Sequence, residues 1–202
     1  MLERDPEQDA VLEAARLSRS DPEMALPKLT ALAERGSVWS MLLVGWAYNA
    51  GAGVTADLAQ AERWYRLAFE GGAQQAQLRL GWTYEQRSDV AGCEEVYGVG
   101  AADGWAPAMY HLAMIKFRQP RTPARLEAAR ILLEQASAQG DLGAQWVLAG
   151  LLWRGRFGLR QIPSGVRLAL DLCKKLTALV DEEDASGDCS SERTTLALAA
   201  RR

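Results

Sequence analysis

The sequence repeats itself with a period of a little over thirty residues. Glycines that close a helix-like stretch fall at Gly36, Gly72, Gly104 and Gly140, at steps of 36, 32 and 36 residues. A period in this range is typical of proteins built from stacked helical pairs. Each pair is too small to bury its own apolar face, so neighbouring pairs must stack to complete the core. The period therefore predicts an all-α solenoid of antiparallel helix pairs.

The segment 37–72 shows how one repeat is expected to form its pair. Small and apolar residues of its first half follow the 3.6-residue helical period, and a glycine-rich stretch at 49–53 ends that helix. Asp57 is expected to cap the second helix by accepting from its free N–H groups. The core columns of both helices recur along the chain, at Val44, Gly45, Ala61, Tyr65, Ala76, Leu80, Gly81, Cys93, Ala108, Leu112, Ala113, Ala144, Leu148, Ala149 and Cys173.

The segment 43–54, which reads LVGWAYNAGAGV, is followed by Asp57, by Trp64 and Tyr65, and by the glycines at 71–72. This pattern resembles the Sel1-like repeat (SLR) family, a branch of the tetratricopeptide-repeat superfamily. The resemblance is most specific over 37–72 and extends unevenly from Asp21 to Leu176. It implies a right-handed superhelix of helix pairs that scaffolds protein complexes, and it implies no shared enzymatic activity.

The repeat boundaries predict one continuous solenoid followed by a tail. We expect an N-terminal capping helix pair at 1–36, repeats at 37–72, 73–104 and 105–140, a divergent C-terminal repeat at 141–185, and a tail at 186–202 that is a short helix or disordered.

Composition favours a cytoplasmic protein. The chain starts with acidic residues and no apolar run, which argues against a secretory signal, and its apolar runs are too short to span a bilayer. Its three cysteines have no paired spacing, which argues against a disulfide framework. The many glycines, alanines and arginines suggest a bacterial source.

Charge is distributed unevenly along the chain. The net charge is −3, yet residues 116–175 carry eleven Lys and Arg against four Asp and Glu. Such segregation can mark an anionic partner or head-to-tail self-association, and it is also compatible with the varied surface of a long stack.

Tryptophans concentrate in first-helix columns that the core does not use. At 100° per residue, the offsets −6, −3, +1 and +4 from the small core residue form one stripe, and in tetratricopeptide relatives this stripe lines a concave groove. Five of the seven tryptophans lie in it. We call this set the aromatic stripe: Trp39, Leu42, Trp46, Trp82, Tyr110, Phe117, Trp146 and Trp153, with Arg118, Arg154 and Glu85 expected at its rim.

An exposed stripe of this kind would bind an apolar helix or extended segment of another protein, with acidic residues at its edge. Two other interpretations stay open. The stripe could be buried between repeats, or the chain's own tail, through Leu196, Ala197 and Leu198, could cover it.

Candidates for chemistry are weak. His111 is the single histidine and lacks a paired nucleophile, so a structural role is expected. No Cys and His set has the spacing of a zinc site, and the glycines at 51–53 lack the lysine of a phosphate loop. The basic residues lack the interleaved aromatics of a nucleic-acid site. We therefore expect no catalytic residues, no metal, no cofactor, no nucleic acid and no membrane insertion.

The sequence thus favours a non-enzymatic scaffold or adaptor. The alternative is a neutralising or regulatory protein of the immunity type, which binds and inhibits a cognate enzyme or toxin.

Overall fold

The computed structural model describes residues 8–118, 122–157 and 159–186. These residues form ten α-helices and one short 3-10 helix, and they contain no strand. The prediction of an all-α fold is confirmed. None of the helices in these ranges has the length and apolar composition that crossing a bilayer requires. The predicted tail at 186–202 falls, from residue 187 on, outside the described residues.

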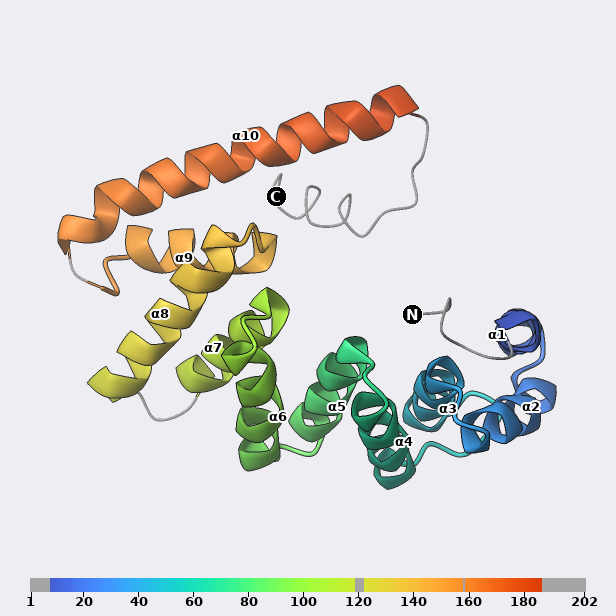
Figure 1. Cartoon of the computed structure of the whole chain (residues 1–202). Coiled ribbons are helices and arrows are strands. Elements are labelled where there is room, and N and C mark those ends of the chain that lie inside the picture. The colour runs from blue at the N-terminus through green and yellow to red at the C-terminus, as the bar shows by residue number, and fades with distance from the viewer. Residues whose placement is uncertain (1–7, 119–121, 158, 187–202) are drawn as a thin grey trace. The chain divides into compact units, whose positions relative to one another are not determined.

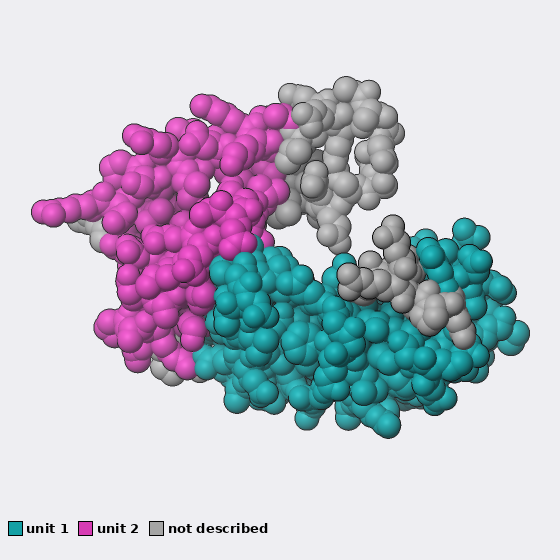
Figure 2. Space-filling model, in the orientation of Figure 1, with its two compact units in different colours: residues 1–115 teal, residues 116–202 magenta. Residues whose placement is uncertain are grey.

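The chain divides into two compact units, residues 1–115 and 116–202, which Figure 2 distinguishes by colour. In the first unit, each helix packs on the next along the chain, from the first helix to the sixth. Figure 1 shows this succession of short helices joined by short loops. The helices are α1 (Gln8–Ser20), α2 (Pro22–Glu34), α3 (Val38–Ala50), α4 (Leu58–Glu70), α5 (Gln74–Gln86), α6 (Val90–Ala102) and α7 (Ala106–Arg118), the last of which contains the boundary between the units.

The second unit contains three further α-helices. They are α8 (Pro123–Ala138), α9 (Leu142–Trp153) and α10 (Ile162–Ser186), with the 3-10 helix η2 (Leu159–Gln161) just before α10. The helix α9 packs on both α8 and α10. The consecutive packing of helix pairs in each unit is that of an α-solenoid.

Helix ends are specified by local sequence. The Asp57 carboxylate accepts from the backbone N–H groups of Ala59 and Gln60, at 2.9 and 3.1 Å, as predicted. The glycines that close the predicted repeats all have positive φ, between 80° and 97°, a conformation that costs a glycine little. They are Gly36, Gly72, Gly104 and Gly140.

The core forms where small residues of one helix meet large residues of the next. A Cβ atom added to Gly45 would lie 2.7 Å from Cδ1 of Tyr65, and one added to Gly81 would overlap the ring of Tyr97. Both tyrosines are fully buried. Glycine therefore lets each ring lie directly against the backbone of the preceding helix.

One core prediction is wrong. Cys173 is exposed, whereas Leu172 and Leu176 are the buried residues of that part of α10. Cys173 lies one residue, or about 100° of helix rotation, after Leu172, which places its side chain off the buried face of the helix. Cys93, by contrast, is buried as predicted.

Candidate binding surface

Two of the three tryptophans that the aromatic stripe has in the first unit are exposed. Trp46, on α3, has 39% of its surface exposed, and Trp82, at the equivalent position of α5, has 48%. The two tryptophans outside the stripe, Trp64 and Trp105, are half-buried. Exposed indoles are therefore confined to the stripe, within the part of the chain that the structure describes.

Other members of the stripe contribute to packing. Trp39 packs against the core cluster around Leu29 and Val44, and Leu42 packs against the cluster that contains Ala76. Tyr110 is half-buried. For Trp39 and Leu42, the interpretation that the stripe is partly buried between helices therefore applies.

Glu85, expected at the rim, belongs to a local network. Its carboxylate accepts a hydrogen bond of 3.1 Å from the Tyr97 hydroxyl and lies 3.8 Å from Nδ1 of His111. The His111 ring stacks on Tyr97, with 5.0 Å between ring centroids, and meets Tyr110 edge-on at 5.2 Å. These contacts support the structural role predicted for the single histidine.

A second polar network links α4 to α5 and was not foreseen from the sequence. The Tyr84 hydroxyl donates to the Glu62 carboxylate at 2.8 Å and accepts from the Arg66 guanidinium at 2.5 Å. Arg87 donates to the other oxygen of Glu62 at 2.6 Å. Burial, together with the hydrogen bond to Glu62, raises the pKa of Tyr84 to about 12. The i,i+4 spacing of Glu62 and Arg66 is the one sequence signal for this network.

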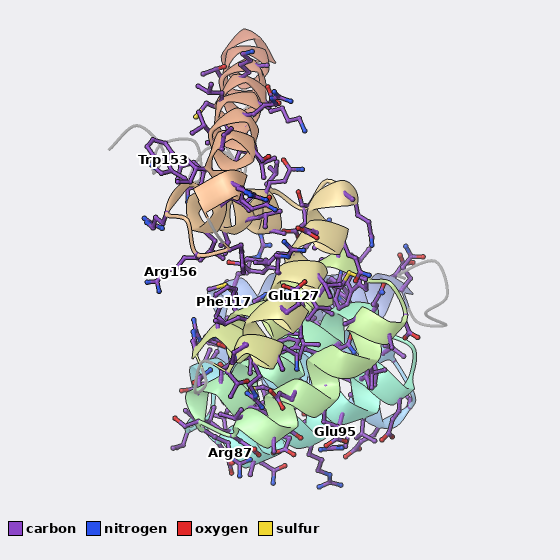
Figure 3. All side chains as sticks on the ribbon, turned by 90° about the vertical axis from the view of Figure 1, so that its left-hand side faces the viewer. Arg87, Glu95, Phe117, Glu127, Trp153 and Arg156 are labelled. Atoms are coloured by element: carbon purple, nitrogen blue, oxygen red, sulfur yellow. The ribbon has the colours of Figure 1, made fainter. Side chains whose placement is uncertain are left out.

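In the second unit, the stripe contributes to a pocket between α9 and α10. Trp146 is 48% exposed and Trp153 59% exposed, and both line this pocket of about 480 Å³ with Arg154. Figure 3 shows Trp153 and Arg156 projecting from the ribbon on the same side. The remaining lining residues are Val147, Ala149, Gly150, Leu151, Ala169 and Cys173.

The sequence indicated the indoles of this pocket but not its floor. Gly150 occupies the column that holds Trp46 and Trp82 in earlier repeats. A Cβ atom added there would meet one atom within 4 Å, Nη1 of Arg154, at 3.3 Å. The missing side chain leaves the space between Trp146 and Trp153 open, and a glycine in a column that otherwise holds large side chains (Trp46, Trp82 and Met114) was the signal for it.

Phe117 and Arg118 lie elsewhere in the second unit. Phe117 is half-buried and meets Phe157 edge-on, with 6.3 Å between ring centroids. The Arg130 guanidinium lies 5.8 Å from the Phe157 ring centroid. Arg118 is exposed. Phe117 thus packs within its own unit.

No group of three or more His, Cys, Asp or Glu side chains is arranged to hold a metal ion among the described residues. Cys93 and Cys173 are free thiols.

Comparison with known proteins bears on the fold and the family. The Sel1 repeat model matches residues 40–72 and 106–141. A comparison with curated protein sequences found no match.

Two solved structures are similar. One is c5321, a protective antigen of uropathogenic Escherichia coli with an SLR fold, at 25% identity and a TM-score of 0.64; the match covers 77% of this chain and 34% of that one. The other is a Sel1 repeat protein from Oxalobacter formigenes, at 20% identity and a TM-score of 0.59, covering 74% and 67%. This chain thus spans about a third of the length of the E. coli antigen. The resemblance to the Sel1-like repeat family is confirmed.

Proposed function

We propose that this chain, a Sel1-like repeat protein, is a non-enzymatic scaffold or adaptor that binds a segment of another protein through the aromatic stripe. Proteins with Sel1 repeats are generally protein-interaction scaffolds, and this kind of repeat is typically non-catalytic. The observation that carries the proposal is the exposure of four tryptophans at stripe positions, Trp46, Trp82, Trp146 and Trp153.

The energetics favour indoles as anchors. A tryptophan buries roughly 150–250 Å² on full burial, so an indole that is half exposed has about 100 Å² left to bury. At about 25 cal/mol per Å², this amounts to about 2.5 kcal/mol for each tryptophan that a partner covers completely. Aromatic side chains are accordingly frequent among residues that dominate interface energies.

The positions of Trp46 and Trp82 suit an elongated partner. They lie at equivalent places on α3 and α5, which are the first helices of consecutive repeats. A helix or extended strand laid across these helices would contact both indoles, as in helix-in-groove recognition.

The test is affinity capture with the tagged full chain and with two double variants. We expect Trp46→Ala with Trp82→Ala to lose the captured partner. The matched control, Leu67→Ala with Val99→Ala, removes exposed apolar side chains from α4 and α6 and should keep it. Circular dichroism verifies that both variants are folded.

A folded Trp46→Ala, Trp82→Ala variant that retains the same partner would contradict the proposal. If the captured partner is an enzyme or toxin and the chain abolishes its activity, the chain is a neutralising protein rather than a scaffold.

A further inference from the structure

We infer that the pocket between α9 and α10 binds an acidic, apolar peptide segment of the partner protein, with a large apolar side chain inserted next to a carboxylate. This inference rests on the proposed function and specifies the chemistry of the partner at one site.

The walls of the pocket are apolar and well separated. Trp146 and Trp153 are seven residues apart on α9, which places them about 10.5 Å apart along the helix axis. Gly150 lies between them and contributes no side chain, and α10 supplies Ala169 and Cys173. The space between the indoles therefore accepts an inserted apolar side chain.

The charge at the pocket is positive and unneutralised. Arg154 is exposed and lines the pocket, and its Nη1 would lie 3.3 Å from a Cβ atom added to Gly150. Its guanidinium makes no hydrogen bond or ion pair with the residues that the structure describes. A carboxylate bound there would gain a charge-assisted hydrogen bond, bidentate if the two planes align.

The surrounding sequence strengthens the electrostatic argument. Residues 116–175 carry eleven Lys and Arg against four Asp and Glu, so the field near the pocket attracts an anionic ligand. At about 480 Å³ the pocket fits one or two side chains. A pocket of this size suits side-chain insertion from a peptide better than it suits the continuous backbone of a nucleic acid.

The test selects random 12-residue peptides, displayed on phage, on the immobilised full chain. We expect the enriched peptides to combine Asp or Glu with Leu, Phe, Met or Trp. Synthetic versions, measured by fluorescence anisotropy, should bind at least tenfold more weakly to Trp146→Ala and to Arg154→Glu. Gly150→Ala, which fills the pocket floor and favours the helix, should also weaken binding without impairing folding.

Matched controls separate the pocket from general effects. Leu170→Ala removes an exposed apolar side chain of α10, Arg167→Glu reverses an exposed charge of the same helix, and neither residue lines the pocket. Both should change the dissociation constant less than twofold.

Cys173 provides an independent readout. It is an exposed thiol in the pocket wall, whereas Cys93 is buried. Bound peptide should slow the alkylation of Cys173 by iodoacetamide, followed by site-resolved mass spectrometry. An unchanged alkylation rate at saturating peptide would overturn the inference.

Other outcomes are equally decisive. Enriched peptides that are basic, or that bind Trp146→Ala normally but not Trp82→Ala, would overturn the inference and leave the proposed function standing. Peptides whose binding depends on neither Trp146 nor Trp82 would contradict both this inference and the proposed function. Self-association in sedimentation velocity that Arg154→Glu abolishes would show that a second copy occupies the pocket, and the assignment to another protein would then be wrong.

Discussion

The contact between Gly81 and Tyr97 makes a sharp prediction about stability. Gly81 lies inside α5, where alanine is favoured over glycine by about 1 kcal/mol in a helix. Its missing Cβ, however, would overlap the ring and hydroxyl of Tyr97, a side chain that is 0% exposed and held by Glu85 and His111. Overpacking of this kind costs about 1–3 kcal/mol. Because the fixed ring cannot move aside, we expect the upper part of that range and a net loss of about 2 kcal/mol for Gly81→Ala.

Gly98 is the matched control. It lies inside α6, and a Cβ atom added there would meet nothing within 4 Å. Gly98→Ala should therefore stabilise the protein by about 1 kcal/mol through helix propensity alone. The same chemical change is thus predicted to have opposite signs at two helical glycines, about 3 kcal/mol apart.

The assay is urea denaturation followed by circular dichroism at 222 nm, a wavelength that reports helix content. The midpoint of unfolding should fall for Gly81→Ala and rise for Gly98→Ala, with unchanged slopes. The double variant Gly81→Ala with Tyr97→Leu should lose less stability than the two single variants lose together. The difference should be about 0.5–3 kcal/mol, because the smaller side chain relieves the overlap. Equal midpoints for the two alanine variants, or strict additivity of the double variant, would refute the reasoning.

Three further predictions concern α4. The Tyr65 hydroxyl is buried without a hydrogen-bond partner among the described residues, so Tyr65→Phe should keep or raise stability by up to about 1 kcal/mol at pH 7 in thermal unfolding. Burial raises the pKa of Tyr65 to about 12 from an ordinary value of 10, so the stability of the protein should decline as pH rises from 10 towards 12. The decline should be less steep in Tyr65→Phe, and equal slopes for the two proteins would contradict this prediction. Asp57→Ala removes the cap of α4 and should cost about 1 kcal/mol, whereas Asp57→Asn should cost less; equal losses would point to charge rather than capping.

The fold was predictable because it depends on local periodicity. Glycines at the ends of repeats and aspartate caps act within a few residues of themselves, and the sequence displays both. The exposure of Trp46 and Trp82 followed from the same periodicity, since a residue's column determines which face of the helix it occupies.

What the sequence could not provide depends on how neighbouring helices meet. Trp39 and Leu42 share the face of Trp46, yet they are half-buried because adjacent helices cover that part of it. The network around Glu62 joins residues more than twenty positions apart. The floor of the pocket between α9 and α10 is formed by Gly150, which has no side chain. Spacing along one helix contains no information on these distances between helices.

The Glu62 network also bears on how the array loses structure. One carboxylate on α4 holds Tyr84 of α5 and Arg87, the residue that follows α5, across the junction between the predicted repeats 37–72 and 73–104. In a one-dimensional lattice of folding units, such a cross-link adds to the nearest-neighbour coupling rather than to the intrinsic stability of either unit. Melting at this junction should therefore be concerted, and a chain cut after residue 72 would leave a carboxylate deprived of two donors at its new end.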